Sequence, residues 1–352
     1  MNNFSKQIHA WYEINKRDLP WRNTQNPYLI WLSEIILQQT RVSQGMNYYL
    51  KFVKNFPTVK KLAQADSEKV MKLWQGLGYY SRARTLHETA KNITKNYNGT
   101  FPANYNELIK LKGIGEYTAA AIASFAYNLT HAVVDGNVYR VISRVFGIET
   151  PIDSTEGKKA FSEKANLLLD KKNPGLHNQA MMEFGALQCV PHNPDCNKCI
   201  LKNNCTAYQT GKVNLLPVKE RKTKVKVIYY YYAVIKQNNK YYLRKRKANS
   251  IWKDLYDFPM IESFRKISDK NVIHGLAEKY LSNKPYKIIH SSNVYTHALS
   301  HRKIEAKFYL FQLSDKKLTK LDLISQTWKK APVIAVPRLI EKYLTEIFGF
   351  KI

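Results

Sequence analysis

The chain has 352 residues, of which 44% are hydrophobic and 24% charged, so it is long enough for two domains and has the composition of a globular protein. Its 56 Lys and Arg residues outnumber 27 Asp and Glu residues; the net charge of +29 favours nucleic acid as partner, although a generally basic proteome would give the same excess. No apolar stretch approaches the roughly 20 residues that cross a bilayer, and no apolar signal segment follows the N-terminus, so we expect a cytoplasmic protein without a membrane partner.

The first part of the chain is predicted to be helical. Between residue 5 and about 188, apolar residues recur three and four positions apart, as in Leu62, Val70, Leu73, Trp74 and Leu77. After a cysteine-containing segment and a basic linker at 206–225, β-branched and aromatic residues predict strands at 225–235, 240–246 and 302–313. Helical patterns return at 270–281 and 337–348. The sequence therefore predicts an all-α domain over 1–205 and a smaller α/β domain over 226–352.

All four cysteines of the chain fall within 17 residues. Cys189, Cys196, Cys199 and Cys205 are separated by six, two and five residues. In an intracellular protein, thiols this close together are more often metal ligands than disulfide partners. Four sulfur ligands suit either Zn²⁺ or an iron–sulfur cluster.

Two glycines in residues 111–121 (LKGIGEYTAAA) indicate a phosphate-binding hairpin. Gly113 and Gly115 can adopt positive φ and bring backbone N–H groups close to a ligand. The N-terminus of the helix that follows would point the same way and attract the same anion. A helix C-cap would explain a single glycine equally well.

Two carboxylates are candidates for acid–base chemistry. Glu34 stands in an apolar run, where burial without a cation would raise its pKa into the range of a general acid. Periodicity alone would instead place it on an exposed face beside Gln38. Asp135 precedes a predicted helix and is expected to cap it, which would keep its pKa low because a capping carboxylate accepts N–H bonds while ionised. One raised and one lowered pKa would divide the roles of acid and stabiliser.

In combination these motifs resemble the MutY family of adenine DNA glycosylases, within the helix-hairpin-helix superfamily that includes endonuclease III. The carrying features are the C-x6-C-x2-C-x5-C spacing, the hairpin residues 111–119 and the run WLSEIILQQT at 31–40. The resemblance implies one 4Fe-4S cluster at 189–205, a helix-hairpin-helix at about 104–127 binding DNA phosphate, Glu34 as catalytic acid and Asp135 as stabiliser of a cationic sugar. The implied substrate is adenine opposite 8-oxoguanine or guanine in double-stranded DNA, extruded before it reacts.

Tyr117 distinguishes between subfamilies. Bifunctional relatives carry a lysine two residues after the second glycine of the hairpin, and its amine attacks the sugar. Here that position is Tyr117, and Tyr139 likewise falls where some relatives carry a lysine. The resemblance therefore implies a monofunctional enzyme that uses water, with Tyr117 in its catalytic site.

The same resemblance assigns residues that contact the bases. Leu37, Gln39 and Tyr79 are the candidates to wedge into the base stack, although the residues alone would place Leu37 and Tyr79 in a core. Further residues match segments that line the adenine pocket, namely Trp21, Arg22 and Glu183. A structural ion pair between Arg22 and Glu183 is an alternative to contacts with the base.

Residues 226–352 resemble the Nudix-like domain with which this family recognises oxoguanine. The resemblance rests on residues 252–259 (WKDLYDFP) and 297–301 (HALSH), where Leu299 replaces a family Phe. Ser300, His301 and Thr40 are candidates to contact the oxidised guanine or its surroundings. No acidic Nudix box follows Pro259, so we expect no nucleotide diphosphatase activity.

Two other functions compete with this interpretation. An endonuclease III-like lyase for oxidised pyrimidines is disfavoured by Tyr117 and by the second domain. A catalytically silent, redox-sensitive DNA-binding protein is disfavoured by the pair Glu34 and Asp135. We expect the protein to act as a monomer.

Overall fold

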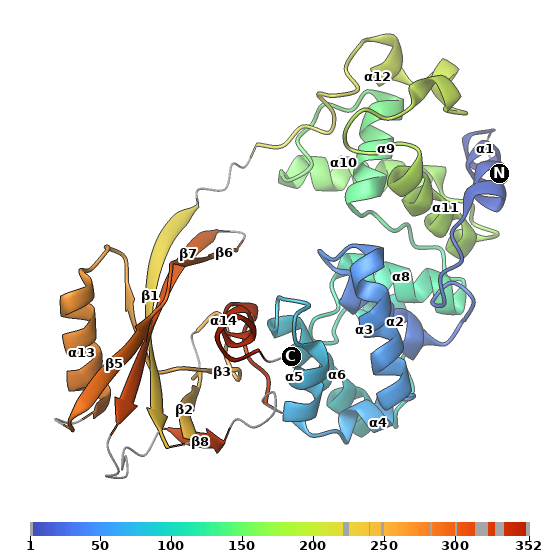
Figure 1. Cartoon of the computed structure of the whole chain (residues 1–352). Helices are drawn as coiled ribbons and strands as arrows, with labels where there is room; N and C mark the ends of the chain where they lie inside the picture. Colours follow the sequence, from blue (N-terminus) through green and yellow to red (C-terminus); the bar gives the residue numbers. More distant parts are fainter. Residues whose placement is uncertain are drawn as a thin grey trace. The chain divides into compact units, whose positions relative to one another are not determined.

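The computed structural model divides into two compact units (Figure 1). The first comprises Met1–Ala65 and Arg84–Lys222, and the second comprises Asp66–Ala83 and Thr223–Ile352. The structure describes residues 3–220, 225–238, 240–247, 250–281, 284–299, 301–313, 323–327 and 334–349. Within these ranges no helix is long and apolar enough to cross a membrane.

The first unit is helical, as the sequence predicts. Its α-helices are α1 (Asn3–Asn15), α2 (Pro27–Leu37), α3 (Val42–Asn55), α4 (Val59–Ala63), α6 (Ser81–Asn96, whose first residues belong to the second unit), α7 (Tyr105–Leu108), α8 (Glu116–Tyr127), α9 (Gly136–Phe146), α10 (Thr155–Leu168), α11 (Pro174–Leu187) and α12 (Thr206–Gln209). Two 3₁₀ turns, η1 (Cys196–Lys198) and η2 (Lys202–Asn204), shape the cysteine segment.

One hydrophobic core joins α1, α9, α10 and α11. Its fully buried side chains include Ile8, Val141 and Phe161, and three of the cysteines pack against it. The chain after the last cysteine stays with this unit: Leu216 is buried, and the N–H of Ile152 donates to the carbonyl of Val218 at 3.0 Å. The domain boundaries drawn from the sequence stay predictions.

The helical pattern over residues 62–77 is divided in the structure. Helix α4 ends at Ala63, and α5 (Ser67–Trp74) begins after Asp66, whose side chain accepts the N–H of Glu68. Leu77 lies in the turn that follows. Helix α5 and this turn belong to the second unit.

The second unit is built on a mixed β-sheet. Its strands are β1 (Lys226–Gln237), β2 (Lys240–Lys245), β3 (Tyr256–Asp257), β4 (Met260–Ser263), β5 (Tyr286–Ser291), β6 (Tyr295–Ala298), β7 (Arg302–Leu313) and β8 (Ile324–Thr327). The order is β3-β2-β1-β7-β5; β4 pairs with β1, β6 with β7 and β8 with β2. Strands β1 and β7 are parallel, and the other pairs are antiparallel.

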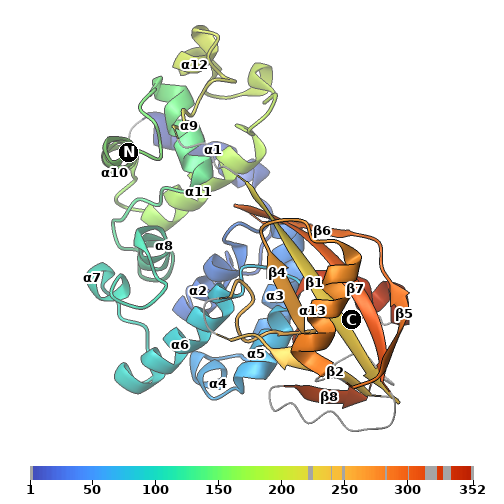
Figure 2. The same cartoon turned by 90° about the vertical axis from the view of Figure 1, so that its left-hand side faces the viewer.

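Helices cover the sheet on both faces. Helix α13 (Asp269–Leu281) packs on Tyr231, Ala233 and Ile235 of β1 (Figure 2). On the other face, Tyr343 of α14 (Arg338–Phe348) stacks on Phe308 of β7 with ring centroids 4.0 Å apart. Burial on both faces explains the nearly continuous apolar and aromatic run of β1. The predicted strands and helices of this region are confirmed.

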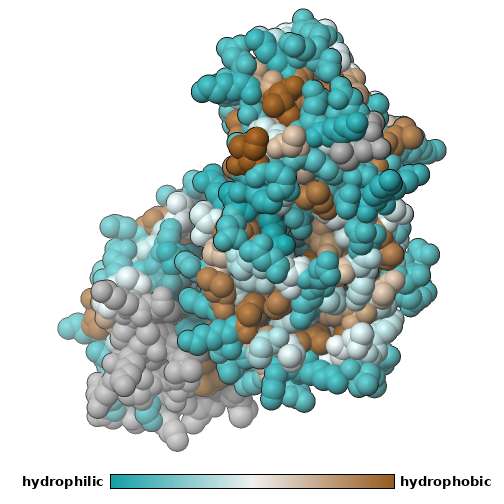
Figure 3. Space-filling model, turned by 90° about the vertical axis from the view of Figure 1, so that its right-hand side faces the viewer, coloured by the Kyte–Doolittle hydropathy of each residue, from teal (hydrophilic) through white to brown (hydrophobic). Residues whose placement is uncertain are grey.

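The surface drawn in Figure 3 is mostly hydrophilic. In the coloured part of this face, hydrophobic side chains form small, separate groups. Large permanent interfaces bury broad apolar surfaces, and the described part of this face presents none.

Candidate active site

Glu34 is a buried acid on α2. Its side chain is only 6% exposed, which excludes the alternative of an exposed polar face. Burial raises its pKa to about 7, and the negative charge of Asp135 acts in the same direction. A hydrogen bond from Tyr117 and the positive charge of Arg22 oppose this rise. The prediction of a raised pKa is confirmed, and Glu34 can be protonated near neutral pH.

Tyr117 stands in the first turn of α8 and faces Glu34. Its hydroxyl donates a hydrogen bond to Oε2 of Glu34 at 2.5 Å. Burial, together with the neighbouring carboxylates, raises its pKa well above the ordinary value. Tyr117 is therefore a neutral hydrogen-bond donor to Glu34.

Asp135 caps helix α9, as predicted. Its Oδ1 accepts the N–H groups of Asn137 at 2.9 Å and Val138 at 2.8 Å, and its Oδ2 accepts the Asn137 amide at 2.7 Å. The expectation of a low pKa is wrong. Burial raises the pKa of Asp135, and its hydrogen bonds only partly offset that effect. Both carboxylates of the pair therefore have raised pKa values.

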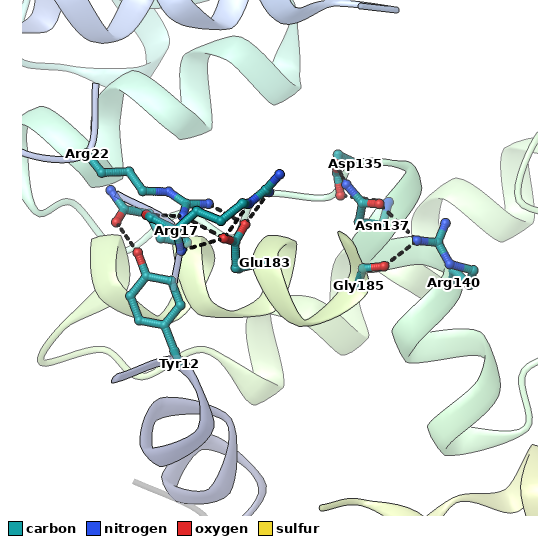
Figure 4. Close-up of polar contacts among 9 residues, drawn as sticks. Tyr12, Arg17, Arg22, Asp135, Asn137, Arg140, Glu183 and Gly185 are labelled. Atoms are coloured by element: carbon teal, nitrogen blue, oxygen red, sulfur yellow. Dashed lines mark hydrogen bonds and ion pairs between the residues drawn. The ribbon is translucent and has the colours of Figure 1, made fainter. Parts of the chain in front are cut away.

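Arg140 holds the Asp135 cap against α11 (Figure 4). Its Nη2 donates to Oδ1 of Asn137 at 2.9 Å and to the carbonyl of Gly185 at 2.6 Å, and its Nε donates to the carbonyl of Cys189 at 2.7 Å. A Cβ atom on Gly185 would lie 2.8 Å from the backbone oxygen of Asn137. The Asp135 turn thus depends on residues of α11 and of the cysteine segment, and sequence reasoning missed both Arg140 and Gly185.

Glu183 forms an ion pair with two arginines (Figure 4). Arg17 reaches its two oxygens at 2.8 and 2.5 Å, and Arg22 reaches them at 2.9 and 2.7 Å. Although burial alone would raise the pKa of Glu183, these hydrogen bonds lower it to about 2. The ion-pair alternative is therefore present, and contact with a base stays a prediction. Sequence reasoning missed Arg17.

Of the other predicted base-contacting residues of the first unit, Leu37, Gln39 and Thr40 lie at the C-terminal end of α2, and Trp21 lies before this helix. Leu37 is half-buried, Gln39 is exposed with φ of 54°, and Thr40 follows it. A positive φ in a non-glycine residue is uncommon and concentrates at functional sites. Trp21 is buried and contacts the ring of Tyr49 edge-on.

Tyr79 occupies a strained turn in the second unit. It is 48% exposed and has φ of 46°, between Gly78 with φ of 81° and the buried Tyr80. The alternative that Tyr79 is a core residue is wrong, because the two glycines at 76 and 78 turn the chain outward and present its ring to solvent.

The glycine hairpin forms between α7 and α8. Gly113 has φ of 75°, but Gly115 has φ of −90° and caps α8 in an extended conformation. Of the two glycines that can adopt positive φ, only Gly113 does so. The N-terminus of α8 at Gly115 is accessible, because a Cβ atom there would have no neighbour within 4 Å. An anion could therefore approach the N–H groups of this helix end.

The four cysteines are partly buried free thiols. Burial raises the pKa of Cys199 to about 11. The hydrogen bond from the N–H of Leu201 lowers this pKa, and the negative charges of the other three cysteines raise it. Arg144 reaches Sγ of Cys189 at 3.5 Å. Among the described residues, no group of three or more His, Cys, Asp or Glu side chains could hold a single metal ion. Four free, partly buried thiols in one short segment are compatible with a 4Fe-4S cluster.

A pocket of about 720 Å³ lies within the second unit, between the Tyr79 turn and the loop that joins β6 to β7. His301, Leu299, Arg302 and Trp252 are among its lining residues. Ser300 lies outside the described residues. The structure therefore brings Tyr79 and His301 to one pocket.

Two family models match the chain. Residues 32–166 match the "HhH-GPD superfamily base excision DNA repair protein", and residues 230–346 match the "NUDIX domain". Among curated relatives, the adenine DNA glycosylase of Buchnera aphidicola subsp. Baizongia pistaciae is 36% identical over 300 residues, covering 85% of this chain and 83% of the relative. That of Buchnera aphidicola subsp. Schizaphis graminum is 33% identical and covers 98% of each chain.

Solved structures resemble the first unit. A thermostable thymine-DNA glycosylase has a TM-score of 0.55 and 31% identity, covering 59% of this chain and 95% of its own. Endonuclease III in a non-covalent complex with DNA has a TM-score of 0.52 at 19% identity, covering 59% of this chain and 94% of its own, which shows the shared fold.

Proposed function

Because this chain belongs to the family of adenine DNA glycosylases, enzymes that hydrolyse the N-glycosidic bond of adenine in DNA, we propose that its substrate is adenine paired with 8-oxoguanine or guanine. The single observation that carries the chemistry is Glu34, an acid buried next to Tyr117 with a pKa of about 7. At neutral pH such a group can both give and accept a proton, as general acid–base catalysis requires.

The reaction begins with extrusion of adenine from the duplex. Glu34 protonates N7 of the base, so that the glycosidic bond breaks with its electron pair moving to the adenine. Asp135 stabilises the resulting cationic sugar or bonds to it transiently. Its three N–H hydrogen bonds favour the ionised form that this role needs, although burial outweighs them and raises the pKa of Asp135.

Water completes the reaction. The ionised Glu34 takes a proton from water as the oxygen bonds to the sugar carbon, which restores the acid and leaves an abasic site. Tyr117 offers a phenol where an attacking amine would be needed, which supports a monofunctional enzyme without efficient strand cleavage.

Binding of the duplex uses both units. Gly113 and Gly115 would present backbone N–H groups to a phosphate. Leu37, Gln39 and Tyr79 would prop the gap in the stack, and Thr40, Ser300 and His301 would contact the oxidised guanine or its surroundings. Trp21, Arg22 and Glu183 would line the adenine site. We expect one chain to be sufficient, since every candidate residue comes from it.

The four cysteines would hold one 4Fe-4S cluster. When bound, such a cluster would cross-link the segment 189–205, which carries Lys198 and Lys202. Arg140 and Arg144 bind carbonyls of this segment and would keep it in shape.

The test is single-turnover cleavage of duplexes with adenine opposite 8-oxoguanine, guanine or thymine, resolved with and without hot alkali. Strand breaks only after alkali, and only for the first two duplexes, would support the proposal. Breaks without alkali would mean a lyase, and no alkali-labile sites with iron-loaded protein would refute the assignment of substrate.

A further inference from the structure

The segment Asp66–Ala83 belongs to the glycosylase region by sequence but packs with the second unit in the structure. It lies inside residues 32–166, which match the glycosylase family model. In the structure it is part of the second unit, together with the Nudix-like sheet. This segment contains α5 and ends with the turn that presents Tyr79.

One end of α5 is attached to the sheet through Glu68. Its Oε1 accepts hydrogen bonds from Nζ of Lys245 at 3.1 Å and from the hydroxyl of Tyr256 at 2.8 Å. Lys245 and Tyr256 are register partners across β2 and β3, so Glu68 binds a pair of residues that the sheet itself holds together. These two hydrogen bonds lower the pKa of Glu68 and keep it ionised.

The other end of α5 is attached through Gln75. Its Oε1 accepts the N–H of Val336 at 3.3 Å and Nζ of Lys72 at 3.2 Å. Lys72 also donates to the carbonyl of Ile334 at 3.4 Å. The turn with Gly76, Gly78 and Tyr79 begins directly after Gln75.

The two attachments join α5 to the sheet and to the segment before α14, and the Tyr79 turn follows directly after α5. The pocket of about 720 Å³ is lined by Tyr79 from this turn and by His297, Leu299 and His301 from or beside that loop. Arg338, two residues after Val336, lines it as well. Glu68 and Gln75 do not line the pocket, so they act on it only through the segments that they join.

We propose that Glu68 and Gln75 are positioning residues that set Tyr79 against His297, Leu299 and His301 and thereby determine the preference for the base opposite adenine. This inference rests on the proposed function. Tyr79 and the residues beside the β6–β7 connection would then contact the opposite base from the same unit. In the sequence, however, Tyr79 lies within the region that matches the glycosylase family model.

The contribution of the Glu68–Lys245 ion pair to folding stability distinguishes a positioning role from a structural one. Glu68 and Lys245 are 47% and 42% exposed, and exposed ion pairs add little to folding stability. Loss of the attachment should therefore leave the unfolding midpoint nearly unchanged. It should instead widen the range of positions that Tyr79 adopts, which weakens discrimination between bases.

The experiment is a charge exchange at the Glu68–Lys245 pair. For Glu68→Lys, Lys245→Glu and the double variant, single-turnover rates are measured on duplexes with adenine opposite 8-oxoguanine and opposite guanine. We expect the ratio of the two rates to fall roughly three- to tenfold in each single variant, the range of an ordinary hydrogen bond in a protein, and to recover in the double variant. Tyr256→Phe, which keeps the ring, should lower the ratio less.

Glu88→Lys is the matched control, because Glu88 is a 55% exposed ion-pair partner of Lys112 in the first unit. It adds the same charge and should leave the ratio unchanged. Equal loss of both rates in the Glu68 variant, an unchanged ratio, or no recovery in the double variant would overturn the inference. A wild-type enzyme that removes adenine from neither duplex, or equally from both, would instead refute the proposed substrate preference.

Discussion

Tyr117 donates a hydrogen bond of 2.5 Å to Glu34, although the two residues are 83 positions apart in the chain. A donor of this kind favours the ionised carboxylate, whereas burial favours the protonated one. Burial has the larger effect, so the pKa of Glu34 remains at about 7. Tyr117 therefore adjusts the acidity of Glu34 and fixes the orientation of its carboxyl group.

Replacing Tyr117 by Phe should shift the pH dependence of excision upward. Without the hydroxyl, the ionised form of Glu34 loses a hydrogen bond and its pKa rises further above 7. The rate of single-turnover excision depends on protonated Glu34, so its decline at alkaline pH should begin at a higher pH, with a lower plateau because the carboxyl is less well oriented. Tyr127→Phe on the same helix, which removes a hydrogen bond to the carbonyl of Phe101, is the control. A decline at the wild-type pH would disprove the coupling.

Glu34→Gln should remove activity and add stability. Amide substitution abolishes proton transfer, so excision should stop while binding of the duplex remains. Because the folded pKa of Glu34 lies above its ordinary value of 4.5, the stability that protonated Glu34 contributes is fully present below pH 4.5 and is lost as the pH rises through 7. At pH 8 the variant should be more stable by about 3 kcal/mol at most, and the difference should vanish near pH 4.5. Denaturation at both pH values tests this, and equal stability at pH 8 would contradict it.

The sequence was sufficient for the local features of the site. The apolar run around Glu34, the position of Asp135 before a helix and the strand patterns of the second unit were read correctly. The family resemblance, and not periodicity, favoured a buried Glu34 over an exposed one. The pKa of Asp135 was misjudged, because its capping hydrogen bonds follow from local sequence whereas its burial depends on distant segments.

The missed features depend on contacts between distant residues. Arg17 meets Glu183 across 166 positions, and Arg140 meets Gly185 across 45. The attachment of Glu68 to Lys245 spans 177 positions, so no local pattern could assign α5 to the second unit. Gly115 can adopt positive φ but does not, because it is the N-capping residue of α8 and has an extended conformation.

Gly185→Ala should impair catalysis from outside the catalytic site. The added Cβ would lie 2.7 Å from Cβ and 2.8 Å from the backbone oxygen of Asn137, so the turn that carries Asp135 must shift. Displacement of a catalytic group by about 1 Å can cost roughly 100-fold in rate. We expect a loss of ten- to 100-fold in single-turnover rate with little change in affinity for the duplex. Gly275→Ala on α13, where the new Cβ meets only a side-chain end at 3.2 Å, is the control. Full activity of the Gly185 variant would show that the turn tolerates the shift.

Arg144→Lys should loosen the cysteine segment. Arg144 is 2% exposed, and its guanidinium donates to the carbonyls of Val190 at 2.8 Å, Pro191 at 3.0 Å and Leu216 at 3.1 Å as well as to Cys189. A lysine keeps the charge but cannot reach acceptors in several directions at once, so buried carbonyls lose their partners at a cost of about 1–3 kcal/mol each. The variant should therefore retain less iron after purification and release it faster to a chelator. The release is measured by the visible absorbance of the cluster. Arg265→Lys, at an exposed position of the second unit, should behave as the wild type. If the Arg144 variant keeps its iron as firmly as the wild type does, the cysteine segment is held by its cluster alone.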